Sequence, residues 1–246
     1  CRIYEALGEW SRACDTIRYL LNMVKTSQDR LALKLRLAEI ENVRLNQYEI
    51  AANLYKEILA DDPQNDRAVS ALEGLMENGQ ALAAVAATLL PVYEQRHDAT
   101  RMTQVLTIQY AMAKPEDLYA LAVRIAGLFE EELGDPAFAL EWYGKAYLNE
   151  QGASLLDHLV ELAERTGNYA KLVEIGQGRL EHGCANDEEK KTLLYIMAEK
   201  QLNKLENLEG AKINFRAILE QWPEEERVLD ALIQIARAEQ NFADLV

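Results

Sequence analysis

The sequence repeats itself, and this internal repetition constrains the fold more than any single residue does. The segment 37–55, LAEIENVRLNQYEIAANLY, can be moved by 88 residues onto 125–143, IAGLFEEELGDPAFALEWY, without a gap. A further step of 72 residues reaches 197–215, MAEKQLNKLENLEGAKINF. Repetition at intervals of this size is typical of arrays in which each structural unit stacks on the next.

The repeated segments have the pattern of helices. In 211–219 the apolar residues Ala211, Phe215, Ile218 and Leu219 recur with helical spacing. The stretch LALKLRL (31–37) alternates like a strand, but it contains helix formers and no β-branched residue. We therefore expect an all-α protein with essentially no strand.

The two steps differ by 16 residues, about one helix and a loop. Between 64 and 113, Pro91 and the stretch EQRHDAT (94–100) interrupt the helical pattern. We expect an irregular additional helix in this interval. The whole chain then contains about fifteen antiparallel helices of roughly 10–20 residues.

The repeats carry a recognisable spacing. An Ala, an aromatic residue, a small or aliphatic residue and a Pro follow one another at Ala51, Tyr55, Ile58 and Pro63, and again at Ala211, Phe215, Ile218 and Pro223. Ala139, Tyr143 and Ala146 match its first three positions, and Gly127 matches the small residue of a preceding helix. This pattern resembles the tetratricopeptide repeat (TPR), in the long divergent form of large bacterial multi-repeat proteins. Glu39, Glu199 and Gln151 depart from it.

The resemblance implies one right-handed α-solenoid over residues 1–246. In that family the first helix of each pair lines a concave surface. Carried over by position, the residues implied to contact a partner are Arg36, Ile40, Arg67, Ser70, Arg124, Leu128, His158, Leu162, Arg165 and Lys200.

Arg36 and Arg124 occupy equivalent positions 88 residues apart. If both face one groove, with Ile40 and Leu128 as apolar neighbours, the groove suits an acidic or C-terminal peptide segment, because guanidinium groups pair with carboxylates. The alternative is that these arginines are solvated or pair with nearby glutamates. Ile196 stands at the corresponding position of the third copy, so the arginine stripe is not continuous.

The three histidines and three cysteines do not form a metal-ligand motif in the sequence. Glu94 and His97 have the spacing of half a di-iron motif, but the second half is missing. His182 and Cys184 provide two ligands, too few for a zinc site. We expect neither a metal nor a cofactor.

The sequence also lacks an arrangement of catalytic groups. Ser154 and His158 lie four residues apart with no oriented acid, and GQG (176–178) lacks the strand and the lysine of a phosphate-binding loop. We expect a protein that is not an enzyme.

Net charge and cysteine content restrict the kinds of ligand and the cellular compartment that we expect. The net charge of −15 disfavours nucleic acid as a ligand, and no apolar run is long enough to cross a membrane. Three cysteines without a C-x-x-C motif indicate a reducing, cytoplasmic compartment. Cys1 suggests a fragment of a longer protein, although an acylated first residue of a periplasmic lipoprotein stays an alternative.

Two functions remain. The first is a non-catalytic scaffold that binds other proteins within a larger bacterial assembly. The second is a regulatory module that senses a peptide and changes curvature when it binds.

Overall fold

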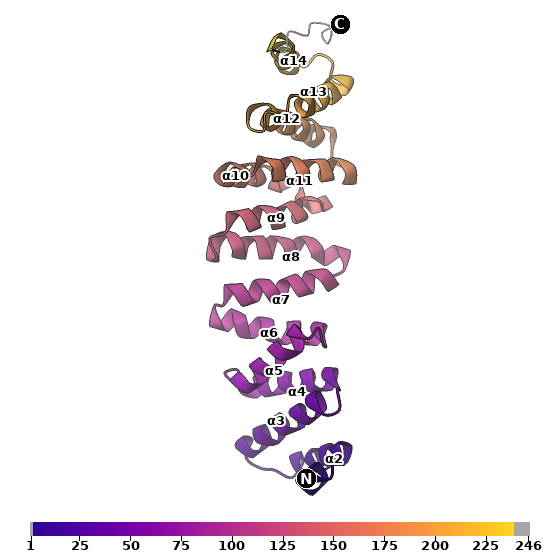
Figure 1. Ribbon diagram of the computed structural model, residues 1–246, viewed down its shortest axis with the longest axis vertical. Coiled ribbons are helices and arrows are strands. Elements are labelled where there is room, and N and C mark those ends of the chain that lie inside the picture. Colours follow the sequence, from indigo (N-terminus) through magenta and orange to yellow (C-terminus); the bar gives the residue numbers. More distant parts are fainter. Residues whose placement is uncertain (1, 239–246) are drawn as a thin grey trace. The chain divides into compact units, whose positions relative to one another are not determined.

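The computed structural model describes residues 2–238, and every regular element in that range is a helix (Figure 1). The all-α prediction is therefore confirmed for this part of the chain. The chain divides into two compact units, Cys1–Met112 and Ala113–Val246. The sequence predicted one continuous solenoid, and the joining of the two units into one array stays a prediction.

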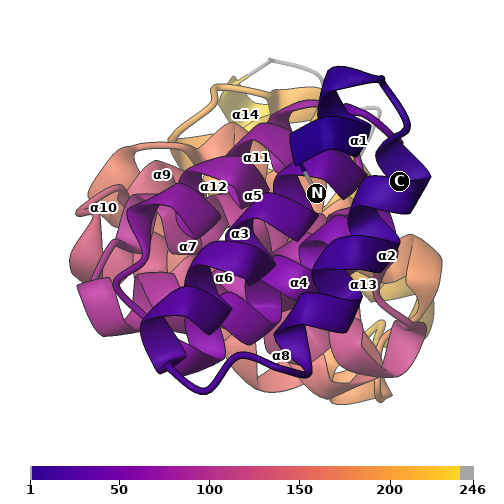
Figure 2. The same ribbon diagram turned by 90° about the horizontal axis from the view of Figure 1, so that it is seen from below.

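Unit 1 consists of helices that pack against their neighbours in chain order. They are α1 (Arg2–Ala6), α2 (Trp10–Leu21), α3 (Ser27–Val43), α4 (Tyr48–Asp61), α5 (Asp66–Glu77), α6 (Leu82–Arg96) and α7 (Ala99–Met112). Helix α4 contacts α6 as well as α5, and Figure 2 shows the helices of this unit from one end. The strand-like stretch 31–37 is helical within α3, as predicted.

Unit 2 has the same organisation with two short irregular helices. Its elements are α8 (Pro115–Gly127), the π-helix η1 (Leu128–Glu132), α9 (Pro136–Tyr147), the 3₁₀ helix η2 (Glu150–Leu155), α10 (Leu156–Thr166), α11 (Tyr169–His182), α12 (Asp187–Asn203), α13 (Leu208–Gln221) and α14 (Glu226–Ala238). The described residues thus contain fourteen α-helices, against about fifteen predicted for the whole chain.

The three sequence copies form three hairpins with the same turn. The hairpins are α3–α4, α8–α9 and α12–α13, and their turns contain Asn46, Gly134 and Glu206, all with positive φ. In each turn the next residue donates its backbone N–H to a carbonyl six positions earlier. These bonds are Gln47 to Glu41 (2.8 Å), Asp135 to Phe129 (2.8 Å) and Asn207 to Gln201 (2.9 Å). The sequence alignment therefore describes a repeated backbone geometry.

Two further turns each place a glycine shortly before a helix. GEW (8–10) and GNY (167–169) place Gly8 and Gly167 at positive φ, immediately before α2 and α11 begin. Glycine suits these positions because it adopts this conformation without a steric penalty. A similar short sequence, QNF (240–242), lies outside the described residues.

The repeated apolar positions form the cores of the hairpins. Ala51, Ala139 and Ala211 are each 0% exposed. The aromatic residues one turn later, Tyr55, Tyr143 and Phe215, are 1%, 9% and 2% exposed. A small residue lets two helices approach closely, and the aromatic ring fills the adjacent space. The predicted burial of all three rings is confirmed.

The interval 64–113 holds α5, α6 and α7, whereas η2, α10 and α11 separate the second and third hairpins. Pro91 lies inside α6 and does not end it. Proline costs the helix one hydrogen bond, but Leu89, Val92 and Tyr93 beside it are buried and hold the helix in place. The chain turns afterwards, at His97, which has a φ of 51°.

Among the described residues, no helix has the length and apolar character needed to cross a lipid bilayer.

Candidate interaction surface

The residues predicted to contact a partner lie on first helices, as the repeat pattern required. Unit 1 carries Arg36 and Ile40 on α3 and Arg67 and Ser70 on α5, whereas unit 2 carries Arg124 on α8, Leu128 on η1, His158, Leu162 and Arg165 on α10, and Lys200 on α12. Arg67, Ser70, Arg124 and Arg165 are exposed, and Arg36, His158 and Lys200 are half-buried. We call the exposed side of α3, α5, α8, α10 and α12 the first-helix face.

Three of the predicted contact residues are buried. Ile40, Leu128 and Leu162 are 6%, 9% and 0% exposed. Ile40 packs against Ala13, Cys14 and Ile17 of α2. Four residues advance a helix by slightly more than one turn, which carries Ile40 away from Arg36 and toward the preceding helix. The prediction that these three side chains contact a partner is therefore corrected. They stabilise the packing of the helices and are not part of the exposed first-helix face.

Three arginines of unit 1 pair with carboxylates two helices earlier in the chain. Arg36 on α3 pairs with Glu5 on α1, and Arg101 on α7 pairs with Glu73 on α5. Between them, Arg67 on α5 donates to Glu39 on α3 over 2.5 Å. The carboxylates Glu5, Glu39 and Glu73 follow one another at intervals of 34 residues. Each of these helices is therefore tied to the one two places before it.

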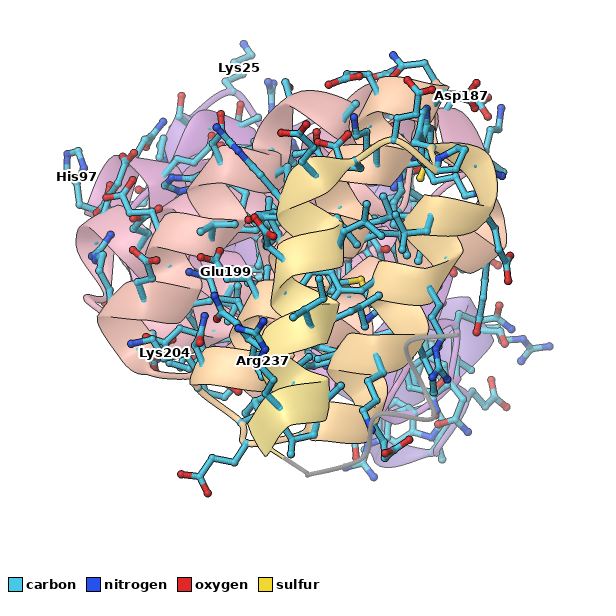
Figure 3. The ribbon with its side chains drawn as sticks, turned by 90° about the horizontal axis from the view of Figure 1, so that it is seen from above. Lys25, His97, Asp187, Glu199, Lys204 and Arg237 are labelled. Carbon is cyan, nitrogen blue, oxygen red and sulfur yellow. The ribbon has the colours of Figure 1, made fainter. Side chains whose placement is uncertain are left out.

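Unit 2 repeats the arrangement. Glu130 of η1 lies 2.8 Å from His158 Nε2 and 2.6 Å from Arg165 Nη1, both on α10. Glu164, 34 residues after Glu130, lies 2.8 Å from Lys200 Nζ on α12. Figure 3 shows Glu199 of α12 and Arg237 of α14 on the same side of this unit. We call the ion pairs of Glu130 and Glu164, together with those of Arg36, Arg67 and Arg101 in unit 1, the inter-repeat ion pairs.

The inter-repeat ion pairs shift the pKa values of two of their members, Glu130 and Lys200. Burial alone raises the pKa of Glu130, but hydrogen bonds from His158 and Arg165 outweigh it, and the pKa falls below its ordinary value. The hydrogen bond to Glu164 raises the pKa of Lys200. Both groups are therefore held in their charged forms at neutral pH.

These ion pairs occupy arginines that were predicted to bind an acidic ligand. Arg36, Arg67 and Arg165 pair with glutamates, as the sequence alternative proposed. An acidic segment would have to compete with these protein carboxylates. Arg36 and Arg124 belong to different units, so a groove shared by both stays a prediction. Sequence reasoning missed the carboxylates, although the spacing of 34 between Glu5, Glu39 and Glu73 was visible.

A groove of about 500 Å³ opens between α3 and α5 in unit 1. We call it the α3–α5 groove. It is lined by Asn42, Val43, Asn46, Tyr48, Ala71, Gly74, Leu75, Asn78 and Gln80. None of these side chains is charged, which sets the groove apart from the ion pairs beside it. A sequence search for charged residues therefore could not predict this groove.

A separate polar cluster is buried in unit 2. The Arg179 and Glu189 side chains are 2% and 7% exposed, and Arg179 Nε lies 2.9 Å from Glu189 Oε1. Arg179 Nη1 also donates to the carbonyl of Asn149 over 2.9 Å. Burial alone raises the pKa of Glu189, but the hydrogen bonds from Arg179 and from the Ala185 backbone lower it. This pair fastens η2 and the α11–α12 loop to the helices around them.

The other residues considered for chemistry have ordinary contacts. His182 Nδ1 lies 2.8 Å from the carbonyl of Gly178, and His158 contacts Glu130 and the edge of the Tyr143 ring. Residues 2–238 contain no group of three or more His, Cys, Asp or Glu side chains able to hold a metal ion. Comparison with family models and with curated protein sequences gives no match to this chain.

Proposed function

We propose that this protein is a non-catalytic protein–protein interaction scaffold, built as a TPR-like right-handed α-solenoid and acting within a larger bacterial assembly. The repeated hairpin supports the proposal. Three copies share one turn geometry and one buried Ala–aromatic pair, and they leave the first-helix face open to solvent. Stacked repeats use such extended faces to bind other proteins.

Site-specific photo-crosslinking in the native cell tests the proposal. A crosslinking residue is placed at Ser70, which is exposed on the first-helix face, and at Ala60, which is exposed on α4. We expect discrete protein adducts from position 70 and none from position 60. A third crosslinking position, 124, samples the first-helix face of unit 2. Equal adducts from positions 70 and 60 would argue against a scaffold that uses this face. So would the absence of adducts from both position 70 and position 124.

A second candidate is a peptide-sensing module that changes curvature. The inter-repeat ion pairs favour it, because each pair ties a first helix to the one two places earlier. A charged partner segment that displaced one carboxylate would loosen that tie. Small-angle scattering of the protein with and without the crosslinked partner separates the two functions: a sensor changes its dimensions on binding, whereas a scaffold does not.

A further inference from the structure

Gly74 is a glycine for which the packing of the protein gives no reason. It lies inside α5, where glycine destabilises a helix relative to alanine. A Cβ atom built on Gly74 meets nothing within 4 Å. Elsewhere, a Cβ on Gly144 would lie 2.5 Å from Ile175, and one on Gly176 would lie 2.6 Å from Met197. Those glycines are needed for close helix packing, whereas Gly74 is not.

The open side of Gly74 faces the α3–α5 groove. Glycine is the usual residue where another chain or a ligand approaches the backbone closely. With no side chain at this position, the floor of the groove next to α5 is main chain. An incoming group could therefore reach the helix surface itself.

The polar groups of the groove are carboxamides and a phenol. Tyr48 Oη donates to Asn46 Oδ1 over 3.1 Å, and Asn78 Nδ2 donates to the Gly74 carbonyl over 2.7 Å. These two bonds use one polar atom of each carboxamide, and each side chain has a second, Nδ2 of Asn46 and Oδ1 of Asn78. Carboxamides both donate and accept hydrogen bonds, as a peptide backbone does.

The surroundings disfavour a negatively charged ligand, and no lining side chain offers a charge to pair with a ligand. The groove lies at the C-terminal ends of α3 and α5, which end at Val43 and Glu77. Helix C-termini carry partial negative charge and repel carboxylates. The nearest arginine on α5, Arg67, is paired with Glu39. A terminal carboxylate, the ligand inferred from the arginine pattern, does not suit this position.

We propose that the α3–α5 groove binds an extended, uncharged segment of a protein partner. The main chain of that segment lies against Gly74, and the carboxamides of Asn42, Asn46, Asn78 and Gln80 bind its amide groups. This inference rests on the proposed scaffold function and names the chemistry of the partner. A saccharide also offers uncharged hydrogen-bonding groups, and the experiment below separates the two.

The test is selection of a displayed library of random 12-residue peptides on the full chain. Gly74→Leu fills the groove, and Ala60→Leu adds the same side chain at an exposed position of α4, outside the groove. We expect the selected peptides to have an uncharged central segment and to bind wild type and Ala60→Leu alike. We expect Gly74→Leu to bind these peptides at least about tenfold more weakly. A tenfold change corresponds to the loss of roughly one good hydrogen bond.

Three results of the peptide selection would overturn the inference: peptides with charged centres, peptides that bind Gly74→Leu as tightly as wild type, or no selected peptide at all. A glycan array gives a fourth. If wild type and Ala60→Leu bind a glycan and Gly74→Leu does not, the groove binds a saccharide instead of a peptide. Thermal melting of Gly74→Leu, with Gly144→Ala as the destabilised reference, shows whether the fold is intact. Crosslinking from position 70 can succeed while the selection fails, so the failure of this inference is distinct from failure of the scaffold function.

Discussion

Arg179 and Arg67 both pair with a glutamate, but they differ in burial. The Arg179 side chain is 2% exposed and the Arg67 side chain 68%. We expect Arg179→Met to lower the free energy of unfolding by about 3–5 kcal/mol, because it leaves Glu189 charged and buried. Arg67→Met is the matched control and should cost less than about 1 kcal/mol. Urea unfolding measures both, and equal losses would contradict this account.

The same buried pair gives a pH dependence. Glu189 has a folded-state pKa below its ordinary value of 4.5, so its contribution to stability is complete above that value. The contribution is lost as pH falls below 4.5 toward the lowered pKa, because the unfolded chain then binds the proton more readily. We expect wild type to lose more stability between pH 7 and pH 3.5 than Glu189→Gln does. Thermal melting at both pH values checks this, and parallel losses would contradict it.

Some side-chain positions could be predicted from the sequence and others could not. Tyr55 and Phe215 are buried as predicted, because a periodic apolar residue has one favourable environment. Ile40 lies in the core although it is four residues from Arg36, because helical periodicity does not fix which flank a residue faces. Gly74 carried no signal, since only the structure shows that the space beside it is open.

Among the elements, the hairpin turns allow a direct comparison of equivalent positions. Gly134 and Glu206 occupy the same left-handed position of two hairpins, with φ of 63° and 52°. Such a conformation costs a residue with a Cβ about 1–2 kcal/mol. We expect Glu206→Gly to stabilise the protein by about 1 kcal/mol and Gly134→Ala to destabilise it by about the same amount. Chemical denaturation measures the signs, and a destabilised Glu206→Gly would contradict the shared geometry.

The aromatic residue of each hairpin provides a second comparison. Tyr55 and Phe215 are almost completely buried, whereas Tyr143 is 9% exposed. We expect Tyr55→Ala and Phe215→Ala to cost about 3–5 kcal/mol, and Tyr143→Ala to lie at the lower end of that range. Equilibrium unfolding of the three variants checks the order. A loss under about 1 kcal/mol at two of the three positions would mean that they are not equivalent core residues.

The elements themselves were the most predictable part of the fold. The offsets of 88 and 72 residues located all three hairpins, and they correspond to the repeated turns. Pro91 was misleading because local propensity favours a helix end there, while the burial of Leu89 and Val92 keeps α6 continuous. The α3–α5 groove depends on two helices that are not adjacent in sequence, so no local pattern predicts it.

At the scale of the whole molecule, ion pairs connect the repeats within each unit. The chain carries a net charge of −15, yet Arg67, Arg165 and Lys200 pair with glutamates of the protein itself and join alternate helices within each unit. This use of charge explains why an arginine pattern alone is a poor guide to the ligand. A continuous solenoid predicts that the same ion pairing continues from one unit to the next.

The central claim is that the repeats form one continuous solenoid that presents its first-helix face to a protein partner. The most direct test is the distance distribution between spin labels on non-natural residues at positions 70 and 154, both exposed and in different units. One solenoid predicts a single narrow distribution, because successive repeats pack on one another throughout. A broad distribution would show that the two units move independently and would contradict a single continuous array.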